Sequence, residues 1–210
     1  MSTVLVVSPH PDDETLGCGG TIRTHVLDGD RVVVVFLTSG EGGGHGRDQM
    51  ETARIREAEA RVAGAQLGVA EQEFWREPDG GLRATATLVD RLRNALAADR
   101  PDVVYVTHGT EMHPDHRAAY RIVIGAVRRL GPDDRPVILA YEIWSPLGRM
   151  DHIVDISPVV DDKIAAIRAY RTQCAVLRFD DAFLALARYR GEMHQWPGGD
   201  YAEIFVRAGL

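Results

Sequence analysis

The stretch VLVVSPHPDDE, residues 4–14, decides the fold and also locates the chemistry. Val4–Val7 is a short, continuous run of apolar, mostly β-branched residues, which predicts a strand that is buried on both faces. The dipeptide Ser8-Pro9 ends this strand. The residues that follow, HPDDE, are rich in side chains that bind metals or transfer protons. A buried strand that leads directly into such a segment is typical of the catalytic edge of a parallel sheet.

Further runs of the same kind follow along the chain and alternate with segments of helical spacing. Strands are predicted at 31–37, 102–106, 136–141, 152–156 and 201–206, and helices at 54–67, 88–96, 118–126, 161–170 and 181–189. Alternating strands and helices predict an α/β fold, a Rossmann-like and mostly parallel sheet with helices on both faces. We find no linker or internal repeat, so we expect a single domain over residues 1–210.

Composition restricts the classes of function. Hydrophobic residues make up 45% of the 210 residues and charged residues 26%, so the chain can form a sizeable core. The net charge of -7 argues against nucleic acid as a partner, because phosphate binding needs a basic face. Two cysteines do not form a disulfide framework. Without a signal peptide or an apolar run long enough to cross a bilayer, we expect a cytoplasmic protein with no membrane partner, and a homo-oligomer would be compatible.

Two polar clusters follow predicted strands, and together they favour a metal site. His10 and Asp13 from the first cluster and one histidine of the second, HPDH at 113–116, could complete the three protein ligands of catalytic zinc. Either Asp12 or Asp115 could then take a proton from metal-bound water. Each cluster alone is better explained by a rigid His-Pro turn or by acidic residues at a helix N-terminus. The presence of both after buried strands favours the metal site.

These motifs resemble those of the LmbE/PIG-L family of zinc N-deacetylases. The resemblance rests on PHPDDE at 9–14, GCGGT at 17–21 and HPDH at 113–116. Weaker matches extend it over nearly the whole chain, at 38–41, 54–57, 78–80, 163–173 and 201–205. The glycines at 17–20 lack the G-x-G-x-x-G spacing of a dinucleotide site, so we interpret them as close packing of a helix on the sheet.

The resemblance implies a role for each matching residue. It implies that zinc, one ion per chain, is bound by His10, Asp13 and His116, although another divalent ion would be compatible with these ligands. Asp12 would be the general base. His113 would stabilise the oxyanion or help to protonate the leaving amine, and Asp115 would orient a histidine.

The sequence identifies the residues that would bind the substrate less clearly than the metal ligands. By resemblance, Arg54 and Asp79 face the sugar, although a solvated helix residue and a turn former are the plain alternatives. Glu41 is either a carboxylate facing the ligand or a cap. Several aromatic and loop residues could line the pocket. They are Trp75, Trp144 and Trp196, for which packing is the alternative, and His45 and Arg47, for which a plain loop is the alternative.

The sequence therefore predicts a zinc-dependent hydrolase that removes an acetyl or other acyl group from the nitrogen of a small amino-sugar substrate. One alternative is an amidase that cleaves a larger acyl group or a thiol-sugar conjugate with the same metal site. The other is a sugar- or nucleotide-binding module without catalysis, which would lack a ligand or the base.

Overall fold

A seven-stranded sheet forms the centre of the protein, which the computed structural model describes for residues 1–193 and 198–209. Its strands are β1 (Thr3–Ser8), β2 (Arg31–Thr38), β3 (Glu71–Glu77), β4 (Val103–Thr107), β5 (Val137–Tyr141), β6 (His152–Asp155) and β7 (Ala202–Arg207). They lie in the order β3-β2-β1-β4-β5-β7-β6. Strands β1 to β5 are parallel, and β7 is antiparallel to both of its neighbours. The predicted α/β fold is confirmed.

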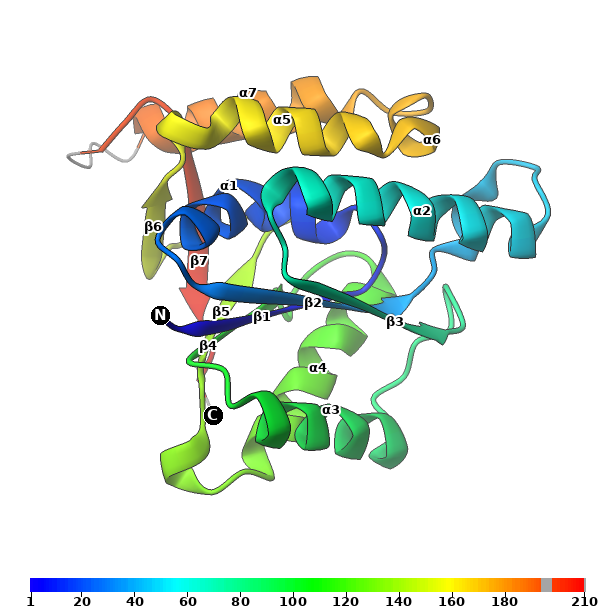
Figure 1. The fold of residues 1–210 in the computed structure, drawn as a ribbon, viewed down its shortest axis with the longest axis vertical. Coiled ribbons are helices and arrows are strands. Elements are labelled where there is room, and N and C mark those ends of the chain that lie inside the picture. Colours follow the sequence, from blue (N-terminus) through cyan, green and yellow to red (C-terminus); the bar gives the residue numbers. More distant parts are fainter. Residues whose placement is uncertain (194–197, 210) are drawn as a thin grey trace.

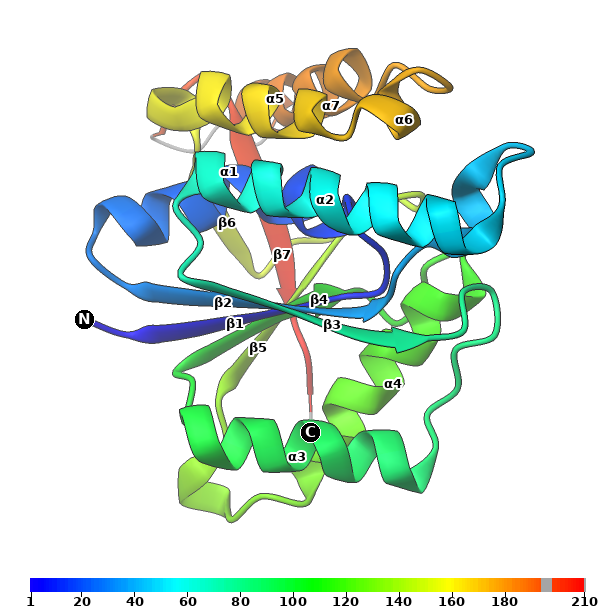
Figure 2. The same ribbon diagram turned by 45° about the vertical axis from the view of Figure 1, so that its right-hand side comes forward.

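Helices cover both faces of the sheet. They are α1 (Asp13–Leu27), α2 (Gln49–Leu67), α3 (Ala86–Asp99), α4 (Pro114–Arg128), α5 (Val160–Ala169), α6 (Arg171–Cys174) and α7 (Phe179–Met193), with short 3-10 turns η1 (Glu41–Gly44), η2 (Pro132–Asp134) and η3 (Ser157–Val159). α1, α2, α5 and α7 lie on one side and α3 and α4 on the other (Figure 1), an arrangement that the rotated view repeats (Figure 2). Among the described residues, no helix has the length and apolarity needed to cross a membrane.

Side-chain alternation explains why the first strand is apolar at every position. Val4 and Val6 pack into the core beneath α1, α2 and α5, whereas Leu5 and Val7 pack into the opposite core beneath α3 and α4. All four side chains are buried. A strand covered by helices on both faces therefore needs an apolar residue at each position.

β3 is the one strand of the sheet that the hydrophobic pattern does not predict. It forms one edge of the sheet, and Trp75 is its one buried residue. An edge strand with little burial carries no continuous apolar run, so its sequence, EQEFWRE, does not look like the other strands. The other predicted strands and helices are present, with ends shifted by a few residues.

Two glycines confirm the close packing of α1 on the sheet. A Cβ atom at Gly17 would lie 2.1 Å from the ring of Tyr141, and one at Gly20 would lie 2.6 Å from Ile156. Neither position has room for a larger side chain. The glycine-rich segment therefore serves helix packing, as its spacing predicted.

A buried ion pair holds α1 where it bends. Cys18 has non-helical backbone angles, so the helix restarts there. The amides of Gly20 and Thr21 donate to the carboxylate of Glu203 at 3.0 and 2.8 Å, which caps the second half of the helix. Lys163 Nζ in turn lies 2.6 Å from Glu203 Oε1. The closing strand β7 and α5 thus fix the helix that begins at Asp13.

The strand order leaves a crevice at the carboxyl edge of the sheet. β1 lies between β2 and β4, and the chain runs from β1 to β2 and β3 before it crosses to β4. The connections that leave β1 and β4 therefore diverge, which is where open α/β sheets bind ligands. Both polar clusters of the sequence are on these two connections.

Candidate metal centre and catalytic site

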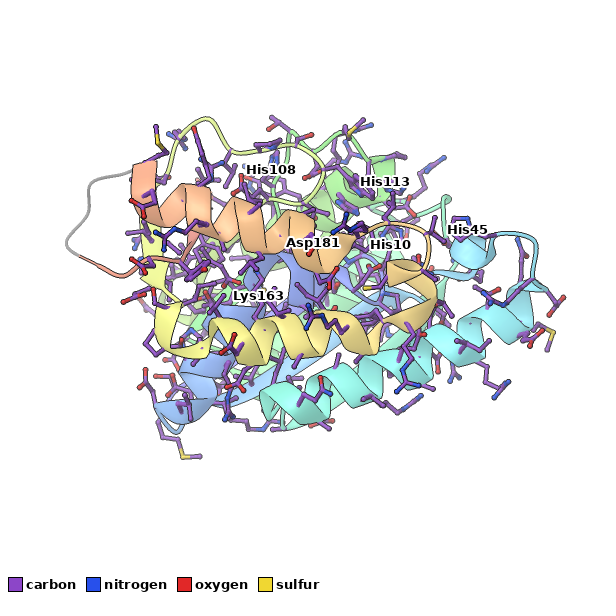
Figure 3. All side chains as sticks on the ribbon, turned by 90° about the horizontal axis from the view of Figure 1, so that it is seen from above. His10, His45, His108, His113, Lys163 and Asp181 are labelled. Atoms are coloured by element: carbon purple, nitrogen blue, oxygen red, sulfur yellow. The ribbon has the colours of Figure 1, made fainter. Side chains whose placement is uncertain are left out.

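A cavity of about 400 Å³ opens at this edge of the sheet, and connections from several strands line it. His10 comes from the connection after β1, Asp79 from the one after β3 and His113 from the one after β4. His10, His113 and His45 lie toward the same end of the molecule in Figure 3. The cavity therefore gathers side chains that are far apart in the sequence.

Three of the predicted ligands meet at one carboxylate oxygen. Asp13 Oδ2 is 3.0 Å from His10 Nδ1 and 3.2 Å from His116 Nε2. Around a tetrahedral zinc ion with ligand bonds of about 2.0–2.1 Å, neighbouring donor atoms would be roughly 3.3 Å apart. These two spacings are close to this value, so Asp13 Oδ2 is placed to share a metal ion with either histidine.

The surroundings of these atoms are also those of a cation site. All three side chains are buried, and within the described residues His116 Nε2 makes no aligned hydrogen bond. Burial by itself would lower the pKa of His116, but the neighbouring Asp13 raises it to about 9. Burial would raise the pKa of Asp13, yet His116 and His10 hold it well below its usual value. The site thus stabilises positive charge, which a divalent ion would supply in place of the protons.

Other donors lie close enough to form different sets. The ligand atoms of His10, His113 and His116 lie within 4.8 Å of one another, and so do those of His10, Asp79 and Asp115. His10 belongs to every set, because its two ring nitrogens face different neighbours. Nδ1 faces Asp13 at 3.0 Å and Nε2 faces Asp79 at 3.0 Å. His10 is therefore the central histidine of the site.

Asp12 has a strained backbone beside the ligands. Its φ of 125° lies in the left-handed region that favours glycine, and its side chain makes no cap bond to α1. Asp12 thus occupies the N-cap position of α1 without capping it through its side chain. Its amide instead donates to Glu14 Oε2 at 3.1 Å, and Glu14 is buried and receives a hydrogen bond from Tyr170. Strain held in place by such contacts is typical of functional positions.

An ion pair fixes the carboxylate of Asp12. Arg56 Nη2 donates to Asp12 Oδ2 at 2.9 Å and to Pro11 O at 2.5 Å. Burial raises the pKa of Asp12 to about 7, although Arg56 acts in the opposite direction. A carboxyl group with a pKa near neutral pH can both take up and release a proton under working conditions.

His113 is the N-cap of α4, and this role fixes which of its nitrogens carries the proton. Its Nδ1 accepts a hydrogen bond from the amide of Asp115 at 3.3 Å. Burial lowers the pKa of His113, and the nearby His10 and His116 lower it further. A neutral ring whose Nδ1 accepts must carry its proton on Nε2. His113 also lines the cavity, so this N–H is available to a bound oxygen.

Asp115 contacts both the turn after β3 and His10. Its Oδ2 accepts from the amide of Gly80 at 2.7 Å and its Oδ1 from that of Leu82 at 3.2 Å, and His10 Nε2 lies 3.4 Å from Oδ2. The side chain is fully buried and does not line the cavity. Asp115 therefore holds the turn at residues 78–82 against His10.

The predicted substrate residues divide between the cavity and its surroundings. Asp79 lines the cavity, and its carboxylate accepts from the amide of Gly42 at 2.8 Å; His10 holds the pKa of Asp79 at about 2 against the effect of burial. Glu41 does not line the cavity, and its Oε1 accepts from the amide of Asp79 at 2.8 Å. The side chain of Glu41 therefore holds the turn that carries Asp79 and does not cap a helix there.

Arg54 does not reach the cavity. It is exposed on α2 and lines a separate hollow between α2 and α5, whereas Arg56, two residues later, is buried and lines the cavity. The sequence contains the Arg-x-x-Glu spacing twice, at 54–57 and again at 56–59. Both copies fit the motif equally well, so this spacing alone does not choose between Arg54 and Arg56.

Of the predicted aromatic and loop residues, some line the cavity and others do not. Trp144 lines the cavity, whereas Trp75 is buried against Arg91 and is a packing residue. His45 lines the cavity from the glycine-rich loop, and Arg47 does not. Trp196 lies outside the described residues.

Comparison with known proteins identifies a family and several relatives. The family model described as PIG-L, GlcNAc-PI de-N-acetylase, matches residues 5–127. The chain is 33% identical to a Bacillus cereus protein named probable N-acetyl-alpha-D-glucosaminyl L-malate deacetylase 2, over 84% of this chain and 86% of the relative. It is 31% identical to 1D-myo-inositol 2-acetamido-2-deoxy-alpha-D-glucopyranoside deacetylase 1 of Saccharopolyspora erythraea, over 81% and 77% of the two chains.

A solved structure extends the likeness to three dimensions. N,N'-diacetylchitobiose deacetylase from Pyrococcus horikoshii superposes with a TM-score of 0.87, at 26% identity, over 99% of this chain and 84% of that one. The fold and these relatives place the protein among the hydrolases. The chain belongs to the PIG-L (LmbE) family of de-N-acetylases.

Proposed function

We propose that the protein is a zinc-dependent N-deacetylase that removes the acetyl group from a small, amino-sugar-containing molecule. The observation that carries the proposal is the position of Asp13 Oδ2, 3.0 Å from His10 Nδ1 and 3.2 Å from His116 Nε2. Zinc accepts this mixed nitrogen and oxygen donor set. The names of the two curated relatives described above, both deacetylases of N-acetylglucosamine compounds, support the choice of reaction and substrate class.

His10, Asp13 and His116 would hold the metal, which in such sites polarises a carbonyl and makes bound water acidic enough to act near neutral pH. Asp12, adjacent to a ligand, would take the proton from the attacking water. It would then return this proton to the sugar nitrogen as the C–N bond breaks, which leaves acetate and a free amine. Arg56 keeps the Asp12 carboxylate in place.

His113 would stabilise the negative oxygen that forms on the carbonyl carbon. Its Nε2 carries the proton because Nδ1 already accepts the amide of Asp115. A neutral donor aimed at the developing charge is typical of an oxyanion hole. Asp79 and Arg56 line the same cavity and would contact the sugar hydroxyl groups.

The proposal is tested by metal content and amine release. Zinc-loaded protein should hold about one ion per chain and release amine from N-acetylglucosamine glycosides, while His10→Ala and Asp13→Ala should lose the ion. His152→Ala is the matched control, because His152 is exposed on β6. Asp12→Asn should keep the ion and lose most of its turnover. Retention of zinc in both ligand variants, or normal turnover by Asp12→Asn, would contradict the assignment.

A further inference from the structure

The cavity has two chemically different parts. Charged and hydrogen-bonding side chains surround the metal centre, whereas a second set at the mouth of the cavity is apolar. This second set, Trp144, Val176 and Leu177, is called the apolar rim below. Its members are 45%, 49% and 45% exposed. Single exposed apolar residues are ordinary, but three that line one ligand cavity indicate a binding surface.

The apolar rim is held in position by its backbone. Val176 and Leu177 lie between α6 and α7, and both of their amides donate to Gln173 O at 3.0 Å. The side chain of Gln173 then donates to Gly43 O at 3.3 Å. The segment that carries the two apolar side chains is thus tied to the glycine-rich loop, which also lines the cavity.

Trp144 is fixed in a similar way. The amides of the residues on either side of it, Ile143 and Ser145, donate to the buried Glu111 Oε1 at 2.9 and 3.0 Å. Its ring packs edge-on against Phe179, with ring centroids 5.9 Å apart. An aromatic ring that is anchored yet nearly half exposed presents an apolar surface at little cost in conformational entropy.

We propose that the substrate carries an apolar aglycone, an alkyl or aromatic group linked to the amino sugar, and that the apolar rim binds it. This inference rests on the proposed deacetylase activity and names its substrate class more closely. The reacting carbonyl would lie among His10, Asp12 and His113, of which His10 and Asp12 are buried, whereas the side chains of the apolar rim are about half exposed. The apolar substituent that reaches the rim is therefore the one that projects out of the cavity from the sugar.

The size of the effect follows from the area that is buried. Each methylene group removed from water strengthens binding by about fourfold. A hexyl glycoside has five more methylene groups than a methyl glycoside and would bury part of them on the rim. We expect its kcat/KM to exceed that of the methyl glycoside by at least about tenfold.

The test compares three substrates with zinc-loaded protein. These are the methyl and hexyl glycosides of N-acetylglucosamine, with the same anomeric configuration, and the methyl glycoside of N-hexanoylglucosamine. A preference for the hexyl glycoside supports the inference. Equal kcat/KM for the two glycosides would overturn it, and so would a gain with the N-hexanoyl compound alone, since that would place the acyl chain on the rim.

Substitutions in the apolar rim test its role, and Val62 provides a matched control for Val176. Val176→Ser and Leu177→Ser should reduce the hexyl-to-methyl ratio of kcat/KM severalfold, whereas Val62→Ser should leave it unchanged. Val62 and Val176 are similarly exposed, at 52% and 49%, but Val62 lies on α2 outside the cavity. An equal loss in Val62→Ser and Val176→Ser would contradict a specific surface.

A binding measurement separates this inference from the proposed activity. Hexyl glucosaminide lacks the acetyl group, so its affinity by calorimetry does not depend on turnover. Tighter binding of the hexyl than of the methyl glucosaminide, lost in Leu177→Ser, would support the apolar rim even if no compound released an amine. Equal binding of both would overturn the rim even if deacetylation were observed.

Discussion

Arg56 Nη2 lies 2.9 Å from Asp12 Oδ2, an ion pair that joins the middle of α2 to the connection after β1. Both side chains are almost completely buried, with 6% and 10% of their surface exposed. Arg56 also donates to Gly40 O at 2.9 Å, so one guanidinium group links three segments around the cavity. The position of the proposed base therefore depends on a residue 44 positions away in the chain.

Arg56→Gln should be far more damaging than Arg54→Gln. Removal of one partner of a buried ion pair leaves an uncompensated charge, which costs about 3–5 kcal/mol of stability. Arg54 is exposed, and its replacement should change the free energy of unfolding by no more than about 0.5 kcal/mol. Urea denaturation together with kcat measures both effects. A greater loss of activity in Arg54→Gln than in Arg56→Gln would show that Arg54, and not Arg56, contributes to the site.

His113→Asn should keep its metal and its helix cap but lose kcat. Asparagine can accept the amide of Asp115 as His113 Nδ1 does, so the cap survives without the imidazole. Loss of an oxyanion donor typically lowers kcat by about 100- to 1000-fold with KM little changed. His116→Asn should instead lose zinc and activity together. Zinc loss from His113→Asn with retention by His116→Asn would show that the two roles are reversed.

Lys163→Met should be rescued in part by Glu203→Gln. The single variant leaves the Glu203 carboxylate buried without its cation, at a cost of about 3–5 kcal/mol. In the double variant the glutamine is neutral, and its single oxygen can still accept from the amide of either Gly20 or Thr21. Chemical denaturation should therefore find the double variant more stable than Lys163→Met. An additive loss would mean that the pair is not energetically coupled.

Glu57 should make stability depend on acid pH. Hydrogen bonds from Arg76, with help from Ser39, hold its pKa below the usual 4.5. A lowered folded-state pKa adds stability that is present above pH 4.5 and is lost as the pH falls through the folded value. Because Arg76 is largely exposed, we expect this contribution to be on the order of 1 kcal/mol at most.

The measurement is the free energy of unfolding from pH 7 to pH 3. Glu57→Gln should be less stable than the parent protein at pH 7, and the difference should shrink below pH 4.5. Glu51→Gln is the control, because Glu51 is exposed on the same helix. A difference that stays constant over this range would exclude the ionised Glu57 carboxylate as its cause.

The central sheet could be read from the sequence because its strands are buried on both faces. A strand such as β1 needs apolar residues at every position, and that requirement is visible without coordinates. The hydrophobic pattern does not predict β3, because an edge strand needs little apolar surface. In the same way, the clusters at 10–13 and 113–116 were recognisable because their spacing along the chain is short. Local pattern therefore predicted the parallel sheet and a metal site of His10, Asp13 and one histidine of the second cluster, whereas the choice of His116 came from the family resemblance.

Contacts between distant segments were decided only by the tertiary structure. Nothing in the local sequence distinguishes Arg56 from Arg54, because the two differ in which side of α2 they occupy and in what packs there. The same holds for Trp144 and Leu177, which share a cavity although they are far apart in the chain. Spacing within a helix or loop is a property of the sequence, whereas the neighbours of a side chain depend on how helices and strands pack. The sequence alone therefore determined the sheet and the chemical type of the site, and the folded chain determined which arginine supports Asp12 and which residues form the cavity.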